Sequence, residues 1–465
     1  MLIAAICTVS LLFFSCSGDD NNNNGQIGGK DTDSGSDPEP SEEQWEIERI
    51  SSDAGVGLQA KIAIGPNDAP GLAFFENKAF DDGICNEIET DPPIRRRQNL
   101  YFAEKQNLTD KWSVDLVDKP VVILEPAGLS LAFAPNGAPA LAYTGGIPQK
   151  QYCGGNNAVL AIRGSNGTWT TETASAQSSD SATGDVASDA GFVVGFWPAV
   201  AFDSKGQPAI IHQDIHFGLL QSDDIRRTDA EFAWKTGGSW SHEAIDFGEG
   251  AGDYNAILFD STDTPIVFYT IPVEVQMNSR KGVWAARRSA AGDWDEKVQL
   301  YDGSVYKKIS VARNPVTGNL TVAYYAADQK AVQIRTCLND DDFADATAWT
   351  TEIVGKAQYD EGRYVSLAFT STGQTVLAYH RCKRLTSTAE GCDQNDEAVV
   401  FALKTGNDWN ITTIRNADVG SCGEYTSLAI DSANTAYVAF RCTEQDGTDF
   451  MFKLFVASKK LSTTP

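Results

Sequence analysis

The sequence has little positive charge for its length. Its 465 residues include 37 lysines and arginines against 63 aspartates and glutamates, and the formal net charge is −26. A nucleic-acid partner requires a basic surface that can neutralise phosphates, so the composition predicts no nucleic-acid binding. The acidity fits a soluble exported protein and leaves room for cation binding, although simple solvation is the favoured explanation.

Several motifs that would indicate an active site are also missing. The chain has no serine nucleophile elbow, phosphate-binding loop, His-Glu-x-x-His zinc motif or Cys-x-x-Cys pair. No catalytic residue is therefore predicted, and a non-enzymatic role is favoured while the question of an activity stays open. No cofactor is predicted either, because no motif supports a structural cation such as Ca²⁺.

The apolar run at the start of the chain is too short to span a bilayer, and it ends at Ser15-Cys16. It resembles a bacterial lipoprotein signal peptide, which implies removal of residues 1–15 and lipidation of Cys16; an ordinary cleaved signal is the alternative. Residues 16–43 are rich in Asp, Asn, Gly, Ser and Pro, which predicts a disordered acidic tether. The expected location is the bacterial envelope, at the outer membrane or cell surface, with membrane contact through the lipid alone.

A repeat occupies the remainder, residues 44–465. Each copy has an apolar segment, a turn rich in Gly, Asn, Asp or Pro, and a second apolar segment that ends in an aromatic residue, as in residues 129–143. Equivalent positions of the first segment, 54 to 69 residues apart, are Ala63, Ala132, Ala201, Leu258, Ala312, Ala368 and Ala429. A third apolar segment follows, and a fourth begins with tryptophan: Trp112, Trp169, Trp240, Trp294, Trp349 and Trp409. Four strands per repeat predict an all-β fold, a seven-bladed β-propeller with four-stranded antiparallel blades.

The two ends of this repeat region complement each other. The seventh copy stops after its third strand, and an extra strand, residues 44–50, stands before the first copy with Trp45 near its start. We predict that this N-terminal strand pairs in the last blade and closes the ring, which removes an open sheet edge. An open array of strand-rich repeats is the alternative. A closed propeller of this kind is expected to be a monomer.

The alanine-containing strand, the Gly/Asn turn and the Pro-x-Leu-Ala-Tyr segment resemble secreted bacterial β-propellers related to the sialidase superfamily, over about 420 residues. The turn Ser165-Asn166-Gly167-Thr168-Trp169 resembles a reduced sialidase Asp-box that lacks the aspartate. The resemblance implies the propeller fold and does not imply sialidase chemistry.

Nine cysteines are present, and an exported compartment permits disulfides. Six of them fall in loops expected on one face of the propeller, and local pairing suggests the bonds Cys382–Cys392, Cys422–Cys442 and Cys85–Cys153. Cys337 falls at the end of a third strand, towards the opposite face.

The same face carries long insertions, among them residues 77–98, 214–229 and 277–281. Their arginines could together bind a carboxylate or sulfate, but solvated loop charges paired with acidic neighbours are the favoured explanation.

The candidate binding site lies where the strands nearest the axis begin. Aromatic residues recur there at one equivalent position, and charged residues precede some of them; the predicted set is Trp197, Tyr254, Tyr364 and Tyr425 with Asp253, Arg363 and Glu424. Equivalent positions in a closed ring converge on its axis, so these residues should surround the mouth of the ring. An aromatic rim with polar groups suits a sugar, a cation or a peptide, whereas packing between blades is the structural alternative.

The alternating residues His212, Asp214 and His216 form a weak candidate metal set. His212, however, falls where other copies have a buried aromatic residue, which favours a packing role.

Three functions remain open. The favoured one is a non-catalytic binding or scaffold module for a glycan, a peptide or an envelope protein. The alternatives are an extracellular polysaccharide hydrolase or lyase and a purely structural envelope protein.

Overall fold

A computed structural model describes residues 45–50, 56–76, 95–105, 111–123, 128–145, 157–176, 191, 193–215, 228–247, 250–271, 280–355, 358–383, 392 and 396–462. All of them belong to one compact unit, Glu42–Pro465. The predicted signal, lipidation site and tether lie outside the described residues.

Seven antiparallel four-stranded sheets follow one another along the chain. Blade 1 consists of β2 (Val56–Ile64), β3 (Pro70–Glu76), β5 (Leu100–Glu104) and β6 (Ser113–Asp118), and blade 2 of β8 (Leu129–Phe133), β9 (Pro139–Gly145), β10 (Asn157–Arg163) and β11 (Trp169–Ser175). Blade 3 consists of β12 (Val193–Phe202), β13 (Pro208–Ile215), β14 (Thr228–Thr236) and β15 (Ser239–Phe247), and blade 4 of β16 (Asp253–Phe259), β17 (Pro265–Ile271), β18 (Gly282–Arg287) and β19 (Glu296–Tyr301).

Blade 5 consists of β20 (Val305–Arg313), β21 (Leu320–Ala326), β22 (Ala331–Cys337) and β23 (Trp349–Val354), with short 3-10 helices at Asp340–Asp342 and Ala346–Ala348 before its last strand. Blade 6 consists of β24 (Asp360–Phe369), β25 (Thr375–Cys382), β26 (Glu397–Thr405) and β27 (Asp408–Asn416). Blade 7 consists of β28 (Cys422–Ile430), β29 (Thr435–Asp446), β30 (Asp449–Lys460) and the N-terminal strand β1 (Glu46–Arg49).

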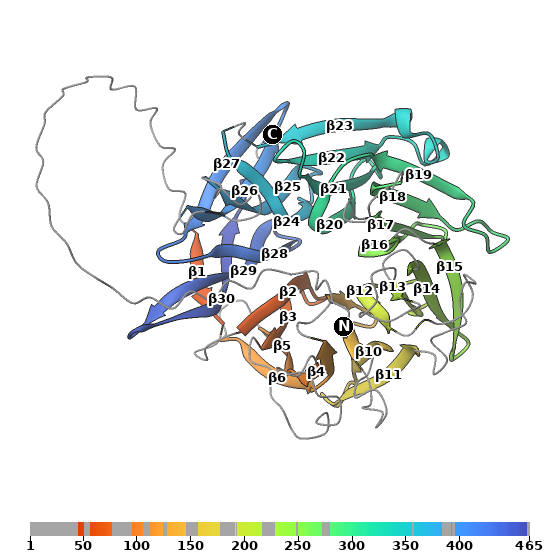
Figure 1. Ribbon diagram of the computed structural model, residues 1–465, viewed down its shortest axis with the longest axis horizontal. Coiled ribbons are helices and arrows are strands. Elements are labelled where there is room, and N and C mark those ends of the chain that lie inside the picture. The colour runs from red at the N-terminus through yellow and green to blue at the C-terminus, as the bar shows by residue number, and fades with distance from the viewer. Residues whose placement is uncertain are drawn as a thin grey trace, which may run out of the picture. The chain divides into compact units, whose positions relative to one another are not determined.

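The sheets form a closed ring, as Figure 1 shows. The first strands of the blades are innermost, and each contacts the first strand of the next blade all the way round, including β28 with β2. Strand β1 pairs with β30 from Glu46 opposite Ser458 to Arg49 opposite Phe455. The predicted seven-bladed propeller and its closure by the N-terminal strand are therefore confirmed.

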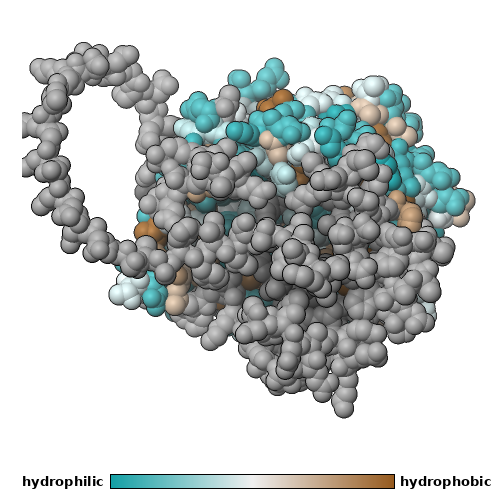
Figure 2. All heavy atoms as spheres, in the orientation of Figure 1, coloured by the Kyte–Doolittle hydropathy of each residue, from teal (hydrophilic) through white to brown (hydrophobic). Residues whose placement is uncertain are grey.

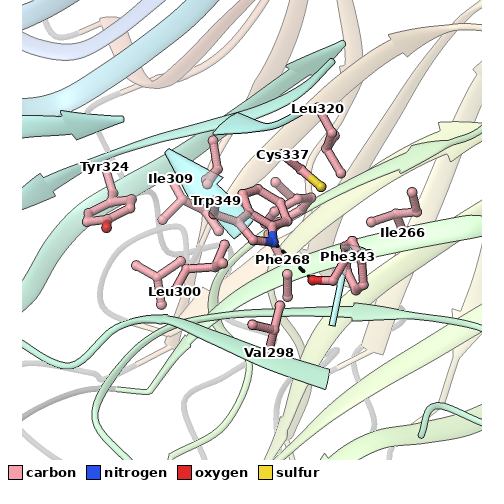
Figure 3. Packing of buried hydrophobic residues seen from close by; sticks show 14 of the residues in the cluster. Ile266, Phe268, Val298, Leu300, Ile309, Leu320, Tyr324, Cys337, Phe343 and Trp349 are labelled. Carbon is pink, nitrogen blue, oxygen red and sulfur yellow. Dashed lines mark hydrogen bonds between the residues drawn. The ribbon is translucent and has the colours of Figure 1, made fainter. Parts of the chain in front are cut away.

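The hydrophobic core lies between the blades. Second strands such as β9, β17 and β21 are buried along their whole length, because neighbouring sheets cover both of their faces. Figure 3 shows the packing between blades 4 and 5, where Phe268 and Ile309 meet Trp349. The indole Nε1 of Trp349 donates a hydrogen bond of 2.9 Å to the carbonyl oxygen of Phe343, so the buried ring is also satisfied.

A second recurring contact joins the outermost strand of one blade to the next blade, and it involves the tryptophans of these strands. A carboxylate three residues after the tryptophan bonds to the next blade in several copies, as Glu48 does when it accepts from Lys105 Nζ at 2.6 Å and from Trp112 Nε1 at 3.0 Å. Glu243 accepts in the same way from Arg288 and Trp294. The Trp-x-x-acid spacing thus links consecutive blades, a role that was not predicted from the sequence.

Two of the three predicted disulfides are present, Cys382–Cys392 and Cys422–Cys442. Cys85 and Cys153 lie outside the described residues. Cys337 lies at the end of the third strand of its blade, β22, as predicted, and it is a free, buried thiol. The two 3-10 helices of blade 5 were not predicted, and neither was the small separate sheet in which strand β4 (Arg95–Arg97) pairs with β7 (Val121–Ile123).

Figure 2 shows one face of the molecule, on which the coloured residues are mostly hydrophilic with isolated hydrophobic side chains. Among the described residues, no helix has the length and apolar character needed to cross a bilayer.

Candidate functional site

One backbone feature recurs on the innermost strands. At the position four residues before the repeat's alanine-like residue, the backbone has a positive φ in every blade. These seven residues, called the inner ring below, are Gln59, Gly128, Trp197, Tyr254, Lys308, Tyr364 and Tyr425. A positive φ at a bulky residue costs roughly 1–2 kcal/mol, so its repetition at equivalent positions must be imposed by the fold.

In six of the seven blades the cause is a β-bulge in the innermost strand. The pairing with the second strand shifts register across the inner-ring residue in six blades, for example between Phe196 and Ala199 in blade 3. A glycine with positive φ stands two residues earlier in five blades: Gly57, Gly195, Gly252, Gly362 and Gly423. At Gly195 a Cβ atom would lie 2.6 Å from the Cα of Ala158, so the close approach of blade 2 requires glycine.

This geometry brings the four predicted aromatic residues together in two pairs. The ring centroids of Trp197 and Tyr254 are 4.4 Å apart, and those of Tyr364 and Tyr425 are 5.1 Å apart. All four side chains keep part of their surface exposed. Burial, followed by the nearby charge of Glu424, raises the pKa of Tyr364 well above its ordinary value, so this hydroxyl remains a neutral donor at physiological pH.

The charged residues beside the aromatics are largely paired. Glu424 accepts from Nε of Arg441 at 2.9 Å, and the Arg441 guanidinium lies over Tyr425 (5.1 Å) and over Phe452 (3.8 Å). This stack ties Tyr425 to the β29–β30 hairpin.

Arg363 is held in a similar way. It donates to Asp360 at 3.0 Å, and Asp360 also accepts from the Tyr325 hydroxyl at 2.5 Å. At the third predicted charge, Asp253, the backbone carbonyl accepts a hydrogen bond from the Thr270 hydroxyl.

A row of serines stiffens the same strands. Ser427 Oγ accepts from the backbone N–H of Ile62 in the next blade at 3.1 Å, and Ser130, Ser310 and Ser366 accept equivalent bonds of 3.0 Å. In blade 1 the serine is replaced by Lys61. These serines therefore join four of the seven pairs of neighbouring innermost strands, which suits preorganised binding at the inner ring.

The predicted metal set is not assembled by the described residues. Buried His212 lies 3.6 Å from Glu231, which also bonds to Nδ1 of His242 at 2.8 Å, whereas Asp214 accepts from the backbone N–H of Gly191. His216 lies outside the described residues. Within the described ranges, no group of three His, Cys, Asp or Glu side chains could hold a metal ion. Burial lowers the pKa of His212, in keeping with the favoured packing role.

The loop arginines are only partly described. Arg280 forms an ion pair with Asp246, which fits a loop charge paired with an acidic neighbour and not a shared anion site. Arg226 and Arg227 lie outside the described residues, as do the side chains of Arg95–Arg97.

Comparison with known proteins gives only distant structural similarity. No family model and no curated protein matches the chain. Among solved structures, the chain is similar to a protein of unknown function from Dyadobacter fermentans DSM 18053, with 11% identity, a TM-score of 0.46, and coverage of 89% of this chain and 97% of that one.

Two further similar structures are enzymes. The polysaccharide lyase Uly1 has 10% identity, a TM-score of 0.45, and coverage of 89% of this chain and 91% of that one. A Penicillium chrysogenum alpha-L-arabinanase complexed with arabinobiose has 11% identity, a TM-score of 0.44, and coverage of 73% and 94%. At this level of similarity, none of the three indicates what this chain binds or whether it is catalytic.

Proposed function

We propose that the protein is a non-catalytic binding module and that its ligand, a glycan in the first instance, contacts the inner ring. One observation carries the proposal: bulky residues occupy positive-φ positions at the axis. Strain of this kind is maintained where a side chain must be aimed, and it concentrates at functional sites. Glycine would remove the strain, and blade 2 does use Gly128 there, so the aromatic residues in blades 3, 4, 6 and 7 have another reason to be present.

The chemistry of the inner ring supports a sugar or another amphipathic ligand. The Trp197–Tyr254 and Tyr364–Tyr425 pairs offer aromatic surface, and the neutral Tyr364 hydroxyl offers a hydrogen bond. The hydrolase alternative would need convergent free carboxylates, but Glu424 is bonded to Arg441. A glycan array on the purified protein, with product analysis, separates a binder from a hydrolase or lyase and from a structural protein that binds nothing.

Replacing Trp197 by alanine should weaken binding of a glycan found on the array by about 1–3 kcal/mol, because the indole supplies the largest stacking surface of the inner ring. Titration calorimetry measures the loss. Trp240→Ala is the matched control, since Trp240 stands on the outermost strand of the same blade beside Lys235. Equal affinity of wild type and Trp197→Ala, with a lowered melting temperature, would mean that Trp197 only packs between blades.

We further propose that the propeller is held at the bacterial envelope by a lipid on Cys16. The support is the sequence pattern of residues 1–16 and the acidic tether predicted after it. Metabolic labelling with radioactive palmitate should mark the wild type and not Cys16→Ala. Equal labelling of the two proteins would rule out this anchor.

A further inference from the structure

Lys308 occupies the inner-ring position of blade 5, where blades 3, 4, 6 and 7 have an aromatic residue. Its Nζ donates a hydrogen bond of 2.9 Å to the carbonyl oxygen of Thr426, which belongs to blade 7. The side chain therefore reaches past blade 6 and lies inside the ring of innermost strands.

Lys61 stands on blade 1 at the position of the serine row. The next residue, Ile62, donates its backbone N–H to Ser427, the neighbour of the Thr426 that accepts from Lys308, so Lys61 and Lys308 approach the same stretch of blade 7. Burial lowers the pKa of Lys61 to about 8. Burial and then the positive charge of Lys61 lower the pKa of Lys308 well below its ordinary value, so the two amines interact although they stand on different blades. Both side chains are surrounded by protein yet keep part of their surface exposed to solvent.

Neither amine has a counterion in the described part of the chain. No ion pair joins either lysine to a carboxylate there, and no acidic residue acts on the pKa of either one. By contrast, Lys105 forms an ion pair with Glu48, and Lys235 forms one with Glu172. A buried amine without a counterion tends to lose its proton, whereas an anion from outside stabilises the charged form, so Lys61 and Lys308 are placed to hold a proton together with an anion.

We propose that Lys61 and Lys308 form an anion site within the inner ring, occupied by the carboxylate or sulfate group of an acidic sugar. The proposal deepens the proposed function, on which its choice of a sugar rests, because the same ring offers the aromatic surface that sugars stack upon. A free inorganic anion presents the same oxyanion chemistry, and the experiment distinguishes these two sources.

The test uses the full-length protein, with sodium sulfate, trigalacturonate and neutral galactotriose as probes in titration calorimetry at constant ionic strength. Wild type should bind sulfate and trigalacturonate saturably. Lys61→Met/Lys308→Met should lose both by tenfold or more in Kd, and Lys308→Arg, which keeps the charge, should retain sulfate. Lys111→Met/Lys205→Met, which removes two exposed lysines, is the matched control and should bind as wild type does.

Each outcome decides one part. Sulfate binding that is equal in wild type and the double variant, with both folded by circular dichroism, overturns the anion site. Sulfate binding without trigalacturonate binding overturns the acidic sugar as occupant and leaves a free inorganic anion. The sulfate titration needs no glycan, so it tests the anion site separately from the proposed function. The proposed function fails if the protein binds no glycan on the array.

Discussion

Deletion of residues 44–50 should lower the melting temperature of the propeller by roughly 5–10 °C, because several kcal/mol of packing and strand pairing are lost. The segment completes blade 7 through the pairing of β1 with β30, and buried Ile50 bonds to the carbonyl of Leu454 at 3.0 Å. Trp45 packs edge-on against Phe401 of blade 6, with ring centroids 4.9 Å apart. Differential scanning calorimetry on wild type and the deletion variant measures the shift.

The same strand reaches the other neighbour as well. Glu48 bonds to Lys105 and Trp112 of blade 1, so this short segment connects blade 6, blade 7 and blade 1. Point variants distinguish the loss of these contacts from a general effect of truncation. Trp45→Ala should reproduce much of the fall in melting temperature. Glu46→Ala, which changes an exposed residue of the same strand, should have little effect. A deletion variant that melts with the wild type would show that the ring does not depend on this closure.

The second large effect concerns pH. The native pKa of Lys61, about 8, lies below the ordinary lysine value of 10.5. Between these values the unfolded chain binds more protons than the native one, so the free energy of unfolding should rise as the pH increases through this window. Below pH 8 the charge is present in both states, and the full penalty of burying it, roughly 3 kcal/mol for Lys61, applies.

Urea unfolding at pH 7, 8, 9 and 9.5 in a chloride buffer, free of oxyanions, measures this dependence. Lys61→Met should be more stable than wild type at pH 7, and the difference should shrink as the pH rises. The comparison stops below pH 10, since tyrosines with a raised native pKa, such as Tyr301 at about 12, act in the opposite direction above that point. Parallel curves for the two proteins would mean that Lys61 carries no buried charge.

The architecture was predictable because it depends on local patterns. Two-residue alternation, turn residues and the leading tryptophans define four strands per copy, and the unmatched strand at Trp45 predicted the closure that β1 provides. The Cys382–Cys392 bond was also predictable, because the two cysteines are only 10 residues apart in the sequence.

The inner ring was only partly predictable. Its aromatic residues were found from equivalent positions, and the glycine two residues before each of them, as in Gly195-Phe196-Trp197, was an available signal that went unused. Lys61 and Lys308 could not be recognised, because each looks like an ordinary polar residue of a strand. Only the closed ring places them near each other without a carboxylate. His212 lies opposite Glu231 because of the register between β13 and β14. The spacing of His212 and Asp214 in the sequence gives no information about that register.

Hydrogen–deuterium exchange with a bound glycan tests whether the ligand contacts the inner ring. Contact with the inner ring should protect the segments that carry it in blades 3 to 7, which are residues 195–199, 252–256, 306–309, 362–366 and 423–427. Protection confined to the outermost strands, or to the turns at residues 66–69 and 203–207 beyond the opposite ends of the innermost strands, would contradict it.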